Sequence, residues 1–157
     1  MALISNQFQS RSVQKSYLAI VRGLTDNKGV IDYPLKNISG KIQEAITYYQ
    51  ALSKTELNFP SACYVTSRYS LVRLFPFTGR MHQLRKHMAH IMHPIIADQP
   101  YGCNKQNKIF KERFNLITML LHAETLVFEW EGEAIEINAN PQAEFKRMLN
   151  VLKLSIE

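Results

Sequence analysis

Hydrophobic and polar positions alternate along several short stretches of this chain. A period of two is typical of a β-strand with one buried face. The predicted strands cover residues 15–23, 30–35, 45–52, 67–75, 118–130 and 134–138. In the first of them apolar residues occupy both alternating sets, so we expect both faces of that strand to be covered. Residues 36–43 are polar and predict a loop.

Helical spacing predicts four helices before, between and after these strands; it is shown by apolar residues in three of them and by Lys105, Lys108 and Lys111 in the fourth. They cover residues 2–12, 82–91 and 104–114, and a final segment that starts at Asn140-Pro141. Consecutive strands joined by short turns favour antiparallel pairing. The predicted fold class is therefore α+β, a mainly antiparallel or mixed sheet with helices packed on it.

Length and composition narrow the class of protein. A chain of 157 residues without repeats or a linker suits a single domain over residues 1–157. The net charge of +6 and the pI of about 9.4 are compatible with a nucleic-acid partner, although charge alone does not establish one. We expect no membrane segment, no signal peptide and no disulfide framework, because apolar runs are short and Cys63 and Cys103 are isolated. The predicted location is cytoplasmic.

One segment concentrates the candidate chemistry: Thr78-Gly-Arg-Met-His-Gln-Leu-Arg85-Lys-His87. A turn that leads into a helix leaves backbone N–H groups that attract anions, and Arg80 lies at this junction. Arg85 shares a helix face with His82 and offers a planar fork for a carboxylate or phosphate. Lys86 and the histidine that follows it could meet a phosphate backbone. The alternative is a solvated polar face above an apolar stripe.

A metal site is the second alternative for this segment. His87, His90 and His93 recur every three residues, with His82 nearby. Zinc prefers three or four ligands that are themselves held by hydrogen-bond acceptors, and the neighbouring arginine and lysine side chains would repel a cation. We therefore predict no metal at these histidines, and interpret His93 as a loop residue that hydrogen-bonds the backbone.

The segment resembles the third motif of one family of RNA pseudouridine synthases, the A class of the ribosomal-large-subunit enzymes. Three further pieces resemble that family in the same order: Lys15–Gly23 its K-x-Y-x-A-x-V-x-G strand, Gly29–Leu35 its G-x-I-D-x-P-L segment, and Leu120–Ala123 its M-L-H-A segment. The resemblance runs from about residue 3 to about residue 140. Within the family, Gln43-Glu-Ala-Ile-Thr-Tyr48 is most similar to the tRNA pseudouridine synthase C group.

The resemblance implies an enzyme that isomerises uridine to pseudouridine in RNA, without a cofactor or metal. In the family an aspartate attacks a nucleoside that has been flipped out of its stack, and the detached base rotates and rejoins the sugar through carbon. Tyr17 would pack on the flipped base, Arg85 would pair with the aspartate, and Leu121 would line the base pocket. Predicted RNA contacts are Lys15, Arg80, His82, Gln83, Lys86 and His87. tRNA is the favoured partner and ribosomal RNA the second.

One family motif has no counterpart in this chain. The nucleophile belongs to H-R-L-D-x-x-T-S-G, upstream of the K-x-Y strand, whereas the fourteen residues before Lys15 contain no Asp, His or Gly. The three aspartates of the chain, Asp26, Asp32 and Asp98, fit a turn or other family segments. The resemblance thus implies the C-terminal portion of a synthase catalytic domain, inactive alone. The alternative is a non-catalytic RNA-binding module derived from that fold.

Two physical consequences are expected from this gap. Residues 2–12 should pack differently from the family, or two chains should associate through an uncovered apolar surface. Arg85 should lack its carboxylate partner and bind a solvent anion or another side chain.

Overall fold

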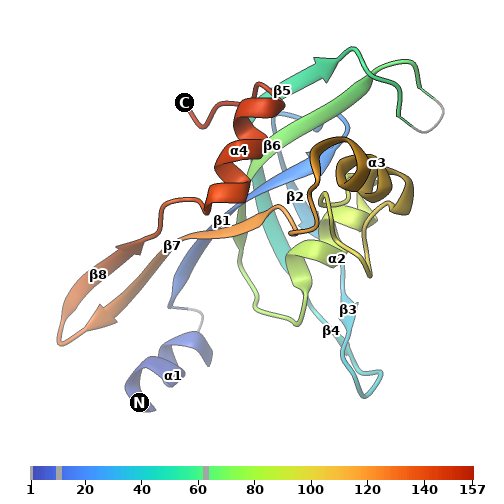
Figure 1. The fold of residues 1–157 in the computed structure, drawn as a ribbon. Helices are drawn as coiled ribbons and strands as arrows, with labels where there is room; N and C mark the ends of the chain where they lie inside the picture. The colour runs from blue at the N-terminus through green and yellow to red at the C-terminus, as the bar shows by residue number, and fades with distance from the viewer. Residues whose placement is uncertain (1, 10–11, 62–63) are drawn as a thin grey trace.

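The computed structural model describes residues 2–9, 12–61 and 64–157 of the chain. Within them, an antiparallel sheet is combined with packed helices, which confirms the predicted α+β class (Figure 1). The helices are α1 (Ala2–Gln9), α2 (Gln83–His90), α3 (Asn104–Phe114) and α4 (Ala143–Val151). The strands are β1 (Gln14–Arg22), β2 (Lys28–Asp32), β3 (Leu35–Lys36), β4 (Ile42–Gln43), β5 (Ile46–Leu57), β6 (Ser67–Pro76), β7 (Leu121–Trp130) and β8 (Glu133–Asn138).

The main sheet has the strand order β2-β5-β6-β1-β7-β8, and each neighbouring pair is antiparallel. β1 lies in the interior of the sheet, where Leu18, Ala19, Ile20 and Val21 have no exposed surface. The prediction that both faces of this strand are covered is confirmed.

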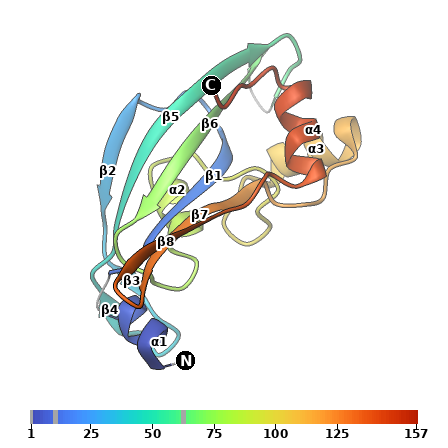
Figure 2. The same cartoon turned by 90° about the vertical axis from the view of Figure 1, so that its left-hand side faces the viewer.

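The two faces of β1 belong to two hydrophobic clusters. Leu18 and Ile20 pack with Phe110 of α3 and with Phe145 and Met148 of α4. These two helices lie near one end of the sheet, whereas α1 lies at the other end (Figure 2). The face is therefore covered by helices along only part of its length.

The opposite face is covered by α2. Ala19 and Val21 of β1 share a cluster with Leu74 of β6 and with Leu84 and Met88 of α2. This packing fixes the first turn of α2 against the sheet, which is where the basic segment begins.

Several boundaries differ from the sequence prediction. Residues 36–43, predicted as a loop, include the paired strands β3 and β4. Their turn is held by Asn37, whose Oδ1 accepts hydrogen bonds from Ser39 Oγ and Lys41 N. The turn is closed by a polar side chain, and this segment has no alternation of apolar and polar residues. The sequence pattern therefore could not predict this hairpin.

The ends of three strands also differ from the prediction. β5 continues to Leu57, beyond the predicted residue 52, because its polar second half pairs with β6 from Ser53 to Leu57. β2 begins at Lys28 and ends before Pro34, and β7 begins three residues later than predicted. Backbone hydrogen bonding between strands determines where each strand begins and ends, and the pattern of side chains reflects it only indirectly.

The N-terminal helix contacts the outer end of β7. Gln7 Nε2 donates to the Glu129 carbonyl, and Glu129 N donates to Gln7 Oε1 at 2.7 Å. The helix ends at Gln9, and residues 10–11 of the predicted segment lie outside the described residues. The expectation that residues 2–12 pack differently from the corresponding segment of the family stays a prediction.

An apolar row remains partly exposed on the face of the sheet away from α2. Val30, Tyr48 and Phe75 are cross-strand neighbours, and Phe77 packs edge-on to Tyr48. Their exposed fractions are 58%, 43%, 37% and 49%. No helix among the described residues is long and apolar enough to span a membrane.

Candidate functional site

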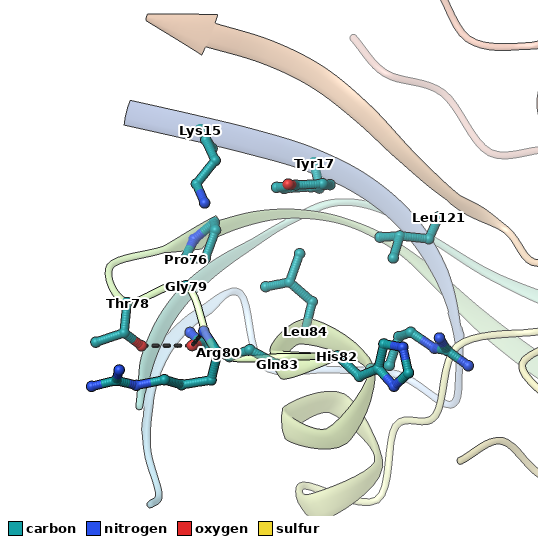
Figure 3. A pocket seen from close by; sticks show the side chains of 11 residues that line it. Lys15, Tyr17, Pro76, Thr78, Gly79, Arg80, His82, Gln83, Leu84 and Leu121 are labelled. Atoms are coloured by element: carbon teal, nitrogen blue, oxygen red, sulfur yellow. Dashed lines mark hydrogen bonds between the residues drawn. The ribbon is translucent and has the colours of Figure 1, made fainter. Parts of the chain in front are cut away.

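A pocket of about 320 Å³ lies between the α2-facing side of β1 and β7 and the turn that leads into α2. Figure 3 shows the side chains that line it. They are Lys15, Tyr17, Pro76, Thr78, Gly79, Arg80, His82, Gln83, Leu84, Arg85 and Leu121. The structure therefore brings the predicted site residues of three separate motifs to one place.

The inner part of the pocket is apolar and aromatic. Tyr17 of β1 and Leu121 of β7 lie above Leu84, the second residue of α2, and point into the same space (Figure 3). Burial raises the pKa of the Tyr17 phenol, so the ring stays neutral at ordinary pH. A flat ring between an aromatic face and two leucines is a suitable ligand for this space.

The mouth of the pocket carries cations. The Arg80 Nε donates to the Glu44 carbonyl at 2.8 Å, which anchors the side chain at the turn. Lys15 lies on the opposite side of the pocket mouth from Arg80 (Figure 3). Its Nζ is close to the turn, since a Cβ added to Gly79 would lie 3.5 Å from it. Burial lowers the pKa of Lys15. Two cations beside an apolar cavity favour an anionic ligand with a ring.

Gln83 holds the turn rather than facing the ligand. Its Oε1 accepts from Thr78 Oγ1 at 2.6 Å and from Arg80 N at 3.0 Å. Its Nε2 donates to the Ile46 carbonyl and to Thr47 Oγ1, both at 2.9 Å. These bonds use both donors and both acceptor positions of the amide. Gln83 thus shapes the pocket that it lines, and its contact with RNA stays a prediction.

Arg85 has a carboxylate partner in this chain. Its Nε and NH2 atoms each lie 2.9 Å from an oxygen of Asp98, whose side chain is only 1% exposed. The hydrogen bond to Asp98 raises the pKa of Arg85. The expectation that Arg85 binds another side chain in place of the nucleophilic aspartate is confirmed, and that side chain is Asp98. Asp98 is buried and bonded, so it is not positioned for nucleophilic attack.

Tyr101 connects the residues around Arg85, although sequence reasoning gave it no role. Its hydroxyl lies 2.9 Å from His82 Nδ1, and its ring centroid lies 5.0 Å from the Arg85 Cζ and 5.9 Å from the Lys86 Nζ. Lys86 thus lies beside Tyr101, outside the pocket lining. The position of the Tyr101 side chain depends on the path of the loop after Asp98, which the pattern of apolar and polar residues does not reveal.

His87 does not reach the surface. The ring is fully buried, with Nδ1 at 2.8 Å from Thr47 Oγ1 and Nε2 at 2.9 Å from the Tyr33 carbonyl. The predicted RNA contact by His87 is wrong, because this side of α2 faces β5 and the end of β2.

The regularly spaced histidines do not converge on a common point. His90 stacks on the Tyr33 ring with centroids 3.6 Å apart, while His93 Nδ1 lies 2.7 Å from the Arg22 carbonyl. The predicted backbone bond of His93 is confirmed. In the described ranges no three His, Cys, Asp or Glu side chains are grouped as metal ligands.

Comparison with known proteins supplies independent information. Residues 2–90, more than half of the chain, match the family described as RNA pseudouridylate synthase. A tRNA pseudouridine synthase C of Haemophilus ducreyi is 48% identical over 136 residues, covering 80% of this chain and 56% of the relative. The protein of that name in Haemophilus influenzae is 41% identical, covering 94% of this chain and 67% of the relative. The chain thus spans little more than half the length of the first relative.

Solved human structures share the fold. RNA Pseudouridylate Synthase Domain Containing 4 superposes with a TM-score of 0.76 at 24% identity, covering 98% of this chain and 67% of that chain. RNA Pseudouridylate Synthase Domain Containing 1 gives 0.70 at 22% identity, covering 96% and 70%. At these identities the likeness establishes the fold alone.

Proposed function

Because this chain belongs to the RNA pseudouridylate synthase family, we propose that its pocket receives one nucleotide of RNA. The observation that carries the proposal is the meeting of Lys15 and Tyr17, Arg80 and Leu121 around one cavity, although they come from three distant segments. The base enters between Tyr17 and the two leucines, and the phosphates lie near Lys15 and Arg80. A base must leave its stack to reach such a space, as in other enzymes that act on bases.

The proposed reaction is the isomerisation of uridine to pseudouridine. The bond between the sugar C1′ and the base N1 breaks, the base turns, and a bond forms between C1′ and C5. C5 then loses its hydrogen to solvent as a proton and N1 takes up a proton, so that no atom is gained overall. The curated relatives named above carry tRNA in their names, and we propose tRNA as the substrate class here, with ribosomal RNA as the second candidate. A cytoplasmic location belongs to the same proposal.

A specific observation favours RNA binding as the activity of these 157 residues by themselves. Among the described residues, those that line the pocket include no carboxylate, and Asp98 behind Arg85 is held in a buried ion pair. The family reaction needs a nucleophilic aspartate beside the base. We therefore propose that the chain binds RNA at this pocket, and that isomerisation requires a carboxylate beyond the lining residues.

The partly exposed row of Val30, Tyr48, Phe75 and Phe77 is part of the proposal as a self-association surface. Its cross-strand alignment makes one continuous apolar strip on a sheet face. Such strips tend to associate in water. The occupant we propose is a second copy of this chain.

The test of the proposed function pairs two measurements on one labelled tRNA transcript. Fluorescence anisotropy gives the Kd, and tritium release from uridine-labelled RNA gives turnover. Lys15→Ala should weaken binding several-fold and reduce the salt dependence of the Kd by about one counterion, whereas Lys146→Ala on α4 removes the same charge and should change little. Equal effects of the two substitutions on the Kd would contradict RNA binding at this pocket. Turnover by the wild-type chain would show that a carboxylate present here acts as nucleophile.

A further inference from the structure

A chain of buried hydrogen bonds joins the pocket turn to the far side of α2. Ile46 N donates to Thr78 Oγ1 at 3.0 Å, and Thr78 Oγ1 lies 2.6 Å from Gln83 Oε1. Gln83 Nε2 lies 2.9 Å from Thr47 Oγ1, which lies 2.8 Å from His87 Nδ1. His87 Nε2 ends the chain on a carbonyl, that of Tyr33, at 2.9 Å.

Backbone groups at both ends fix the direction of every bond in this relay. A carbonyl can only accept, so His87 Nε2 must carry a proton toward Tyr33. Arg80 N can only donate, so the oxygen of the Gln83 amide faces the turn and its nitrogen faces Thr47. Thr47 accepts from that nitrogen and gives its single proton to His87 Nδ1. The neutral ring with the proton on Nε2 is the one form that satisfies all the partners.

Protonation of His87 breaks this order. A second ring proton on Nδ1 would face the Thr47 hydroxyl proton, because a charged imidazole has two donors and no acceptor. Thr47 would have to turn its proton away, in a site where it has no exposed surface. A buried group without a partner is costly, so protonation disfavours the present position of Thr47 and of Gln83, which donates to it. Gln83 also holds Thr78 and the Arg80 backbone, so the disturbance reaches the pocket.

The surroundings of the ring favour the neutral form at ordinary pH. Burial lowers the pKa of His87, and the neighbouring His90 on the same helix acts in the same direction. Asp32 at the end of β2 and the Tyr33 carbonyl oppose these effects. Thr47 is the group that faces the ring from β5.

We propose that His87 is a positioning residue which keeps the turn at residues 78–80 in its anion-binding shape through Thr47 and Gln83, and that its protonation loosens this turn. The inference deepens the proposed function, on which its RNA readout rests. It predicts that acidification weakens RNA binding. Simple charge predicts the reverse, because a more positive chain at low pH should attract phosphate more strongly.

Two substitutions separate the two ends of the ring. His87→Asn places an oxygen near the position of Nδ1 and keeps the acceptor for Thr47, whereas His87→Gln places a nitrogen near Nε2 and keeps the donor to Tyr33. Anisotropy with a labelled tRNA transcript should show the wild-type affinity falling about fivefold or more between pH 7.5 and pH 5.5. His87→Asn should bind like the wild type at pH 7.5 without this fall, and His87→Gln should bind weakly throughout. Wild-type binding that tightens on acidification would overturn the coupling.

Nuclear magnetic resonance of the wild-type chain tests the relay without RNA or substitutions. The His87 ring should carry its proton on Nε2 at pH 7.5, and the amide signals of Ile46 and Arg80 should shift with the same pH midpoint as the ring. A proton on Nδ1 at pH 7.5, or amide signals of Ile46 and Arg80 that do not shift with the pH midpoint of the ring, would contradict the relay. If the amides follow the ring but tRNA binds at no pH, the proposed function fails while the relay stands.

Discussion

Arg85 and Asp98 form a two-pronged ion pair behind the pocket wall, with both hydrogen bonds at 2.9 Å. Asp98 also accepts from Tyr101 N at 3.2 Å, and its carbonyl accepts from Gly102 N and Asn107 Nδ2. The pair therefore fixes the loop after Asp98 to the helix that carries the basic segment.

Removal of the Arg85 side chain should lower the free energy of unfolding. Arg85→Ala leaves the Asp98 carboxylate buried without its partner, and the expected loss of unfolding free energy is about 3 kcal/mol or more. Arg68→Ala is the matched control, since it removes an ion pair of the same kind that is exposed on both sides. Urea denaturation followed by circular dichroism gives both values. Similar losses for the two variants would contradict a structural role for the Arg85–Asp98 pair.

Two glycines near the pocket should respond in opposite ways to alanine. A Cβ at Gly102 would lie 2.1 Å from the Asp98 carbonyl oxygen, so Gly102→Ala must shift the backbone and should strongly reduce the thermal midpoint. A Cβ at Gly79 would make an ordinary 3.5 Å contact with Lys15 Nζ, so Gly79→Ala should fold normally. It should nevertheless weaken RNA binding, because the added methyl group enters the pocket. Normal stability of Gly102→Ala would refute the close approach.

Tyr17 should contribute to RNA binding through its ring rather than its hydroxyl. Tyr17→Phe keeps the aromatic face and should retain the wild-type Kd within about twofold, whereas Tyr17→Leu should raise the Kd about tenfold or more, as expected for loss of one stacked base. Anisotropy titrations at fixed salt measure both. A Phe variant as weak as the Leu variant would assign the effect to the hydroxyl instead.

The stability of the chain should fall on mild acidification because of His87. Burial lowers its pKa in the folded state, while the unfolded chain has the ordinary value of about 6.5. Below that value the unfolded chain binds more protons, so stability is fully present above about pH 6.5 and decreases as the pH drops toward the folded pKa. Urea midpoints at pH 7.5, 6.5 and 5.5 should fall more for the wild type than for His87→Asn. Parallel curves would contradict the assignment.

The exposed apolar row should make association depend on concentration. Sedimentation velocity over a hundredfold concentration range is expected to show a dimer at the upper end. Tyr48→Lys should shift the chain toward monomer, and Val151→Lys, at a comparably exposed position on α4, should not. A wild-type chain that stays monomeric throughout would remove this part of the proposal.

The sequence predicted the site well where one pattern determines one structure. The apolar residues on both sides of β1 predicted that both of its faces are covered, and the motif residues of β1, β7 and the Thr78-Gly79 turn do meet in one pocket. These residues converge because β1 and β7 are neighbours and the turn leads into the helix that covers them.

The error at His87 has a different physical origin. His87 was predicted to meet a phosphate backbone, yet it lies only about 60° around the helix from Leu84, within the buried face. Polarity at such a position is compatible with burial once Thr47 supplies a partner, and that partner comes from a strand distant in sequence. The Asp98 and Tyr101 contacts depend likewise on a loop whose path the sequence pattern does not encode.

The central claim is that a base of RNA occupies the space between Tyr17 and Leu121. The most direct test is photocrosslinking with a tRNA transcript that carries 4-thiouridine, followed by trypsin digestion and mass spectrometry. Trypsin releases Tyr17 in the peptide of residues 16–22. The account predicts a crosslink on this peptide that disappears in competition with unlabelled tRNA. Crosslinks confined to α3 and α4, with none on residues 16–22, would contradict it.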